Sequence, residues 1–247
     1  MNVSLIARFL CMLMLVFSCS SENPMSPSPE NPSGSATTIM PLGASRVEGA
    51  RPEYESYRYE LWKLLVDSGV AFDFVGTRDD TSSYPTYTGR RFDPDHEGRG
   101  GFTSGQILQG LPAWLQQTGG PDIVLLSSPG GNDALTNQSY EQALTNIKAI
   151  IDLLQSANPR VTIIIEQLAP AMSSAMTPQL TAFFNQMQED VPKIAMDERT
   201  ATSTILVVDM ATGFGDSLLA DDVHYNEAGA GFIAARYYDV LQGVLEN

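Results

Sequence analysis

Five short apolar runs alternate with helical segments along this chain, and this alternation limits its fold more than any other feature. The first run begins at Thr37 and stops at the turn Gly43-Ala44-Ser45, and the others cover residues 70–75, 122–126, 161–165 and 204–208. Continuous runs of Val, Ile and Leu are typical of strands that are covered on both faces. Because parallel strands need crossover helices, the pattern predicts one α/β domain, a three-layer α/β/α sandwich with a mostly parallel five-stranded sheet.

Apolar residues at three- and four-residue spacing predict the helices between these runs. Residues 53–68 show this spacing between Pro52 and Gly69, and residues 140–156 and 227–245 show it as well.

Two other helical segments contain a proline, which removes a backbone hydrogen bond and clashes with the preceding turn. We expect Pro112 to kink or divide the segment that starts at Thr103, and Pro192 to limit the one that opens at Pro178. Residues 77–101 have no periodicity and are predicted to form a long loop, a kind of segment that is usually functional or mobile.

The N-terminal segment differs in composition from the rest of the chain. One basic residue, Arg8, precedes an apolar stretch too short to span a bilayer, so residues 1–18 are predicted to be a signal peptide. The stretch ends in Ser18-Cys19, which is similar to a bacterial lipobox, so we expect lipidation of Cys19. The alternative is an ordinary signal peptide that is cleaved nearby. Residues 19–36 are rich in Pro and Ser and predict a flexible linker before a domain at 37–247. We therefore expect an exported, membrane-anchored bacterial lipoprotein, periplasmic or at the cell surface.

The net charge of the chain argues against some classes of binding partner. The 247 residues include 29 Asp and Glu against 14 Lys and Arg, a net charge of −15 at pH 7. Such a surface repels phosphate backbones and anionic headgroups, so we expect no nucleic-acid partner and no membrane contact beyond a lipid anchor. Both cysteines, Cys11 and Cys19, precede the domain, which therefore has no internal disulfide.

In parallel α/β sheets, ligands bind outside the carboxyl ends of the strands, so the loops that follow the runs are the candidate site. These loops carry what acyl transfer needs, namely a serine hydroxyl, a histidine that takes its proton and a carboxylate that orients the histidine. Ser45 supplies the hydroxyl, and the base is His224 or His96, the only two histidines. Asp221 lies three residues before His224, a spacing that suits such a pair but also suits an Asp that caps a helix.

Acyl transfer also needs hydrogen-bond donors around the developing oxyanion. Gly101 is placed to supply a backbone N–H, and Asn132, in Gly130-Gly131-Asn132-Asp133, a side-chain amide. The alternative for the Asn132 segment is a tight turn with the asparagine in left-handed geometry.

In order and spacing, these segments resemble the four blocks of the SGNH hydrolases, also called the GDSL esterase and lipase family, across essentially the whole domain. Residues 57–65, 73–76 and 96–104 are most similar to the branch of acetylxylan-type carbohydrate esterases. The resemblance implies a flavodoxin-like SGNH hydrolase fold that needs no metal or cofactor.

By that resemblance Ser45 is the nucleophile, His224 the base and Asp221 the carboxylate that orients it. The backbone N–H groups of Ser45 and Gly101 and the amide of Asn132 would form the oxyanion hole. His96 would then be structural or would face the substrate.

The chain departs from the family pattern beside the nucleophile, with Ala44 in place of an aspartate and Arg46 in place of an apolar residue. The literal family motif Gly215-Asp216-Ser217 lies four residues before Asp221, with no helix between them, and we interpret it as a loop. The acidic residues Asp93, Asp95 and Glu97 have oxygen ligands that suit Ca²⁺, but they lack the spacing of a recognised calcium-binding loop, so a solvated acidic loop is favoured.

The resemblance implies a carboxylic ester hydrolase that removes short acyl groups, acetyl above all, from carbohydrate through an acyl-enzyme. The alternatives are a catalytically weakened glycan-binding protein at the cell surface and an acylhydrolase that acts on lipids or thioesters. The expected partner is an acylated carbohydrate or another small ester, and the expected state is a monomer.

Overall fold

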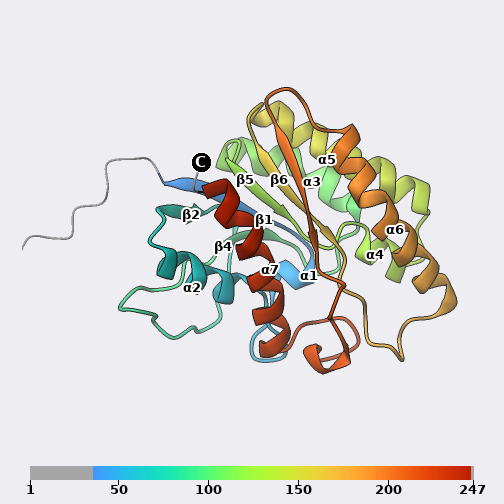
Figure 1. The fold of residues 1–247 in the computed structure, drawn as a ribbon, viewed down its shortest axis with the longest axis horizontal. Helices are drawn as coiled ribbons and strands as arrows, with labels where there is room; N and C mark the ends of the chain where they lie inside the picture. The colour runs from blue at the N-terminus through green and yellow to red at the C-terminus, as the bar shows by residue number, and fades with distance from the viewer. Residues whose placement is uncertain (1–35, 246–247) are drawn as a thin grey trace, which may run out of the picture. The chain divides into compact units, whose positions relative to one another are not determined.

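A seven-stranded sheet forms the middle layer of the structure, a computed structural model that describes residues 36–245 (Figure 1). The predicted signal peptide, Cys19 and the linker up to residue 35 lie outside the described residues. The strand order is β3-β4-β1-β5-β6-β7, with β2 also paired to β1, and all pairs are parallel except β3 with β4. The strands are β1 (Thr37–Gly43), β2 (Phe72–Phe74), β3 (Arg78–Asp79), β4 (Asp95–Gly98), β5 (Ile123–Leu126), β6 (Thr162–Gln167) and β7 (Thr204–Asp209).

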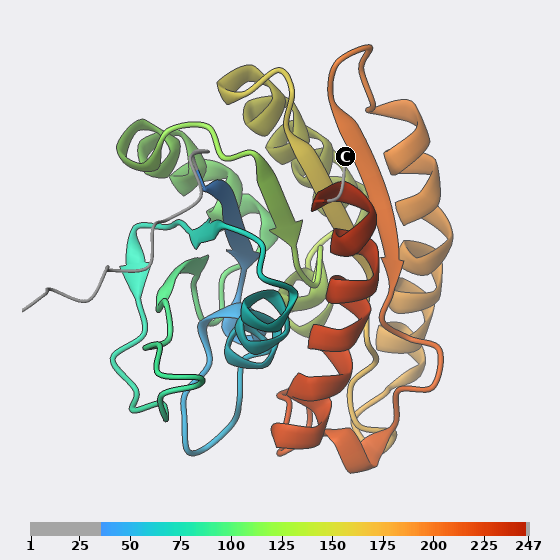
Figure 2. The ribbon, with the colours of Figure 1, turned by 60° about the vertical axis from the view of Figure 1, so that its left-hand side comes forward.

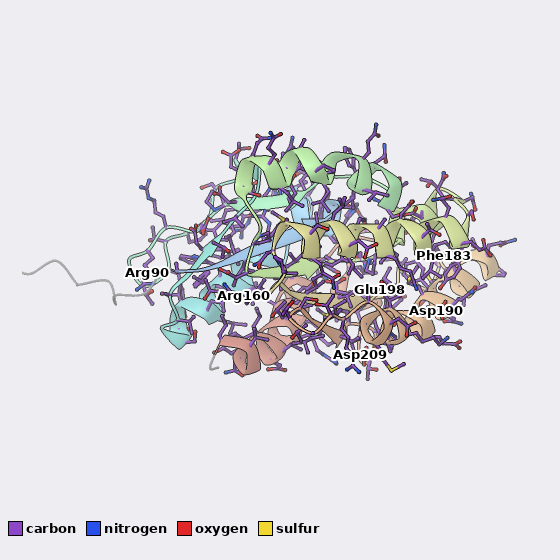
Figure 3. The ribbon with its side chains drawn as sticks, turned by 90° about the horizontal axis from the view of Figure 1, so that it is seen from above. Arg90, Arg160, Phe183, Asp190, Glu198 and Asp209 are labelled. Carbon is purple, nitrogen blue, oxygen red and sulfur yellow. The ribbon has the colours of Figure 1, made fainter. Side chains whose placement is uncertain are left out.

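Helices cover both faces of this sheet, as predicted (Figures 1 and 2). One buried apolar cluster includes residues of α2 and α7, and the other includes residues of α3, α5 and α6. Seen from above, α6, which carries Phe183 and Asp190, forms part of one outer layer (Figure 3). The helices are α1 (Ser45–Glu48), α2 (Arg58–Ser68), α3 (Ser104–Thr118), α4 (Gly131–Leu135), α5 (Tyr140–Ala157), α6 (Pro178–Asp197) and α7 (Glu227–Leu245), with a 3₁₀ turn, η1, at Asp216–Leu218.

The strand at the centre of the site, β1, is paired along both edges. Its register places Ile39 opposite Phe74 of β2 and Ile123 of β5, and Leu42 opposite Glu97 of β4. Because hydrogen-bonded neighbours hold β1 on both sides, the end of this strand is a rigid position for a functional side chain.

The prediction of five strands is wrong, since the sheet has seven. The two additional strands, β3 and β4, lie within residues 77–101, which were predicted to form a loop. Their sequences, Arg-Asp and Asp-His-Glu-Gly, contain no apolar run, although His96 and Glu97 are fully buried. Hydrogen bonds satisfy these buried polar groups, which is why a polar sequence forms an interior strand here.

Two expectations for the helices fail, the start of one at residue 53 and the limit of another at Pro192, and Pro112 does not divide its helix. The segment predicted as a helix from residue 53 becomes helical only at Arg58, which leaves Tyr54 in the preceding loop. Pro112 lies inside α3 and Pro192 inside α6, and neither ends its helix. Each of these helices buries an apolar face, and such packing outweighs the loss of one backbone hydrogen bond.

The described part of the chain has no helix that is both long and apolar enough to cross a membrane.

Candidate active site

Ser45 lies where β1 passes directly into the short helix α1, at the carboxyl end of the sheet. Gly43 makes this sharp turn possible, because a Cβ at that position would lie 2.8 Å from Cγ2 of Val47 and 3.0 Å from the carbonyl oxygen of Ser127. The serine therefore follows a rigid strand at a sharp turn, as the sequence predicts, and it opens a short helix that the sequence does not predict.

The structure brings Ser45, His224 and Asp221 together, although 179 positions separate the serine from the histidine. Nε2 of His224 lies 2.9 Å from Oγ of Ser45, and Nδ1 lies 2.7 Å from Oδ2 of Asp221. If Nδ1 donates its hydrogen to the carboxylate, Nε2 is left to accept the serine proton. This arrangement can activate the Ser45 hydroxyl for attack on a carbonyl carbon.

Asp221 is fixed by its own loop. Its Oδ1 accepts the backbone N–H groups of Val223, at 2.8 Å, and of His224, at 2.7 Å. Burial acts to raise the pKa of Asp221, but these bonds and the one to the imidazole outweigh it and hold the pKa below its usual value. The group therefore stays a carboxylate that can orient the histidine.

Tyr54 is a site residue that the sequence does not reveal. Its ring stacks on the imidazole of His224, with centroids 3.8 Å apart and an interplanar angle of 14°. The backbone places it there, because the N–H of Glu55 donates to the carbonyl oxygen of Tyr225, next to the histidine, at 2.8 Å. The only available signal was the pair of turn residues Gly49 and Pro52, which suggests a loop before the helix.

Three hydrogen-bond donors near Ser45 have no acceptor within residues 36–245 and could bind an oxyanion. Asn132 lies in α4, and its Nδ2 donates one hydrogen to the carbonyl oxygen of Phe102 at 2.9 Å, which leaves the other free. Gly101, just before Phe102, has φ 77°, and its N–H and that of Ser45 have no acceptor within residues 36–245. The left-handed residue of the Gly130-Gly131-Asn132-Asp133 segment is Gly130, with φ 74°, so the asparagine turn considered as an alternative does not form.

A small pocket opens beside Ser45, with a volume of about 40 Å³. One water molecule needs about 10–15 Å³ on this scale, so the pocket has room for a group of a few heavy atoms. Ser45, Asn132 and Ser128 supply polar groups, and the apolar wall comes from Leu135, Leu168, Ala171, Phe184 and Val223.

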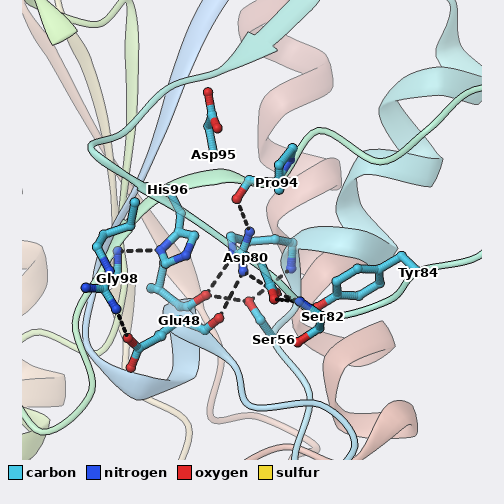
Figure 4. Close-up of polar contacts among 12 residues, drawn as sticks. Glu48, Ser56, Asp80, Ser82, Tyr84, Pro94, Asp95, His96 and Gly98 are labelled. Carbon is cyan, nitrogen blue, oxygen red and sulfur yellow. Dashed lines mark hydrogen bonds and ion pairs between the residues drawn. The ribbon is translucent and has the colours of Figure 1, made fainter.

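The second histidine, His96, and the second serine motif, which contains Ser217, do not contribute to the site at Ser45. His96 is buried in β4, where its Nδ1 accepts the N–H of Gly98 at 2.9 Å (Figure 4). Burial, aided by the charge of Arg58, lowers the pKa of His96 to about 2, so this imidazole stays neutral. Ser217 lies in η1, where its carbonyl oxygen accepts from Asn226, and it makes no bond to His224.

The acidic cluster is built into the fold. Oδ2 of Asp93 accepts the N–H of Phe74 at 2.8 Å, and the carboxylate of Glu97 pairs with Arg99 and accepts from Thr77. Glu97 is fully buried, so the expectation of a solvated acidic loop is wrong for this residue. Within residues 36–245, no group of three or more His, Cys, Asp or Glu side chains could hold a metal ion.

Comparisons with known proteins bear on the family of the chain. The model of the GDSL-like Lipase/Acylhydrolase family matches residues 67–231, a range that includes Asn132, Asp221 and His224 but not Ser45. A search of curated proteins returns no significant match.

Solved structures of three esterases are similar over 85% of this chain. A serine-to-alanine mutant of an acetyl esterase with an acetate ion is 27% identical, with 98% of its chain covered and a TM-score of 0.73. A carbohydrate esterase family 3 protein from Talaromyces cellulolyticus is 27% identical, with 98% covered and a TM-score of 0.72. A family 3 carbohydrate esterase from Clostridium thermocellum is 29% identical, with 99% covered and a TM-score of 0.66.

The family match spans more than half of the chain, and the similar structures share both the sheet and the helical layers. The chain therefore belongs to the GDSL-like lipase/acylhydrolase family, and it is a carboxylic ester hydrolase.

Proposed function

We propose that this enzyme removes short acyl groups, acetyl above all, from carbohydrate by way of an acyl-enzyme on Ser45. The observation that carries the proposal is the chain of hydrogen bonds from Asp221 through His224 to Ser45 at the mouth of a small apolar pocket. The similar structures that are described as an acetyl esterase and as family 3 carbohydrate esterases support this substrate class.

In the proposed reaction, Oγ of Ser45 attacks the ester carbonyl carbon while Nε2 of His224 takes the hydroxyl proton. The negative charge that forms on the carbonyl oxygen is met by the N–H groups of Ser45 and Gly101 and by the free amide hydrogen of Asn132. His224 then passes the proton to the leaving alkoxide, so the alcohol departs and the acyl group remains on Ser45. Water, deprotonated by His224, attacks this acyl group. His224 then returns the proton to Oγ of Ser45 as the acyl–oxygen bond breaks, which releases the carboxylic acid and restores the serine.

The pocket supports a short acyl group. Its apolar wall suits a methyl or another small alkyl group, and a volume of about 40 Å³ leaves little room for a longer chain. A lipid acylhydrolase needs an extended apolar channel, so this pocket favours the carbohydrate esterase over that alternative.

The test compares the parent enzyme with three variants on a short-chain aryl ester and on acetylated xylan. We expect Ser45→Ala and His224→Ala to lose hydrolysis by about 10³-fold or more, since the residues of a triad act as a unit. Ser217→Ala, which removes the serine of the second motif, is the matched control and should keep the parent rate.

A fluorophosphonate that labels activated serines, followed by peptide mapping, identifies the nucleophile directly. Label on Ser45 in the parent supports the assignment. A parent that hydrolyses esters while Ser45→Ala keeps the full rate refutes it. A parent that binds acetylated xylan but neither labels nor hydrolyses would instead be the catalytically weakened glycan-binding protein.

We further propose that the protein is exported and anchored through a lipid on Cys19. The apolar stretch that ends at Ser18-Cys19 supports this proposal. In cells, Cys19→Ser should move the enzyme from the membrane fraction to a soluble fraction, and an unchanged membrane fraction would contradict the anchor.

A further inference from the structure

We propose that Arg46 is a positioning residue that sets the geometry between nucleophile and base. It ties the helix that begins with Ser45 to the two segments that carry His224 and one wall of the acyl pocket. This inference rests on the proposed function, in which Ser45 is the nucleophile and His224 the base.

The helix that carries Ser45 cannot hold its own orientation. It has only four residues, whereas isolated helices shorter than about 12 residues are marginal in water. Its N-cap residue is Ala44, and no side chain caps the free N–H groups of its first turn. Contacts with the rest of the fold must therefore fix where the Ser45 hydroxyl points.

Arg46 supplies such contacts toward the base and the pocket. Its Nε donates to the carbonyl oxygen of Val223 at 2.8 Å, and Val223 is the residue before His224. Its Nη1 donates to the carbonyl oxygen of Ala169 at 2.8 Å and its Nη2 to that of Pro170 at 3.1 Å. These two residues precede Ala171, which lines the pocket. One guanidinium thus links positions adjacent to the nucleophile, the base and the acyl pocket.

The electrostatics of Arg46 indicate a role other than surface solubility. The residue is only 7% exposed, and within the described residues it forms no ion pair. Its guanidinium lies 4.8 Å from the ring centroid of Tyr225, so an aromatic face covers the charge. Within the described residues, the guanidinium donates to three backbone carbonyl oxygens and forms no ion pair, although its charge acts on the buried carboxylate of Glu166 and on Tyr225. Burying a cation in this way is an unfavourable choice for stability alone. It is an effective choice for holding three backbone segments in one arrangement.

Only arginine can make this set of contacts. The planar guanidinium carries five N–H donors in fixed directions, whereas the lysine ammonium is a single point on a flexible stem. Arg46→Lys therefore keeps the positive charge but cannot reach the carbonyl oxygens of Val223, Ala169 and Pro170 together.

Arg236 provides a control with similar carbonyl acceptors, although its side chain is 32% exposed and it also forms an ion pair with Asp209 at 4.0 Å. Its guanidinium also donates to two backbone carbonyl oxygens, those of Asp209 at 2.9 Å and Thr212 at 2.6 Å, and it also lies over an aromatic ring, that of Phe232, at 4.9 Å. These contacts join α7 to the end of β7, and none of them involves a residue that lines the pocket at Ser45. Arg236→Lys thus repeats the chemical change away from the site.

The experiment measures three quantities for the parent, Arg46→Lys and Arg236→Lys. These are kcat and KM on an aryl acetate, the second-order rate of fluorophosphonate labelling at Ser45, and the midpoint of thermal unfolding. A displacement of about 1 Å costs about 10²-fold in rate, so we expect Arg46→Lys to lose about 10- to 100-fold in both kcat and labelling rate. Arg46 itself lines part of the pocket, but the apolar side chains of Leu135, Leu168 and Phe184 are unchanged in Arg46→Lys, so KM should stay within about threefold. Arg236→Lys should lower the unfolding midpoint but keep both rates within about twofold.

The outcomes separate the two proposals. If the parent is not labelled at Ser45, the proposed function fails. If the parent is labelled and a folded Arg46→Lys is labelled at the same rate, or if only its KM changes, the positioning role fails. Should Arg46→Lys not fold, Arg46→Gln, which keeps one carboxamide donor and carries no charge, decides the question by the same comparison.

Discussion

Replacing Asn132 by alanine tests the oxyanion site most directly, because the amide of this residue has two separable tasks. One hydrogen is donated to the carbonyl oxygen of Phe102 at 2.9 Å, and the other has no acceptor among residues 36–245 and is available to the substrate. Loss of the first bond should lower the free energy of unfolding by about 0.5–1.5 kcal/mol. Loss of the second removes one oxyanion donor, which should lower kcat by about 10²–10³, or about 2.7–4 kcal/mol in the activation barrier.

The assay is hydrolysis of an aryl acetate under saturating conditions, combined with urea unfolding of the same preparations. We expect KM to change little, since the donor acts mainly on the charge that develops in the transition state. Asn146→Ala is the control, because the Nδ2 of Asn146 likewise donates one hydrogen bond, to Oγ of Ser104 at 3.0 Å, but this buried residue does not line the pocket. That variant should lose stability and keep kcat.

A folded Asn132→Ala that keeps kcat within about threefold of the parent would refute the assignment of this amide to the oxyanion hole. The same conclusion would follow if Asn132→Ala and Asn146→Ala lost activity equally, since the effect would then track stability and not the site.

Three further predictions concern the histidine stack, the pocket and the response to pH. Tyr54→Phe should keep kcat/KM within about twofold, because it keeps a ring stacked on His224. Tyr54→Leu should lower kcat/KM by about tenfold, because it loses the stacked pair, which contributes about 0.5–1.5 kcal/mol. An equal loss in both variants would contradict a role for the stack. Phe184→Leu enlarges the pocket wall and should raise the kcat/KM ratio of butyrate to acetate esters by about tenfold, and an unchanged ratio would exclude this wall as the acyl site. The third prediction concerns the free energy of unfolding between about pH 6.5 and about pH 4, measured by urea unfolding at each pH. On acidification this free energy should fall more steeply in Asp93→Asn than in the parent. In His96→Asn it should fall less steeply than in the parent. Burial raises the pKa of Asp93 to about 6, so the folded state gains stability by taking up that proton, whereas burial lowers the pKa of His96 to about 2, so the unfolded chain takes up that proton first.

The central strands could be predicted because they are apolar throughout. The strands β5 and β6 consist of Ile-Val-Leu-Leu and Thr-Ile-Ile-Ile-Glu-Gln, and helices cover both of their faces. The polar strand β4 could not be found in the same way, because its buried side chains are stabilised by hydrogen bonds from distant residues, such as the one from Thr77 to Glu97. Hydrophobic periodicity contains no information on such pairs.

The contact of Ser45 with His224 could be predicted because a parallel sheet brings the carboxyl ends of its strands to one edge. Tyr54 was missed for the opposite reason. Its spacing to Tyr57 and Leu61 fits a helical face, so periodicity assigns it to α2, but the bond from Glu55 to Tyr225 holds it against the histidine instead. The three acceptors of Arg46 were likewise beyond prediction, since they are backbone oxygens and carry no side-chain signal.

The length and direction of β1 also set how far the nucleophile lies from the start of the described domain. Thr37 begins this strand, Gly43 ends it and Ser45 follows two residues later, so about 23 Å of strand, at about 3.3 Å per residue, lies between the point of entry and the turn that carries the nucleophile. The end of α7 lies toward the same end of the sheet as Thr37 (Figures 1 and 2). A laboratory support attached directly at Thr37 or at the end of α7 would leave the nucleophile at the opposite end of the sheet.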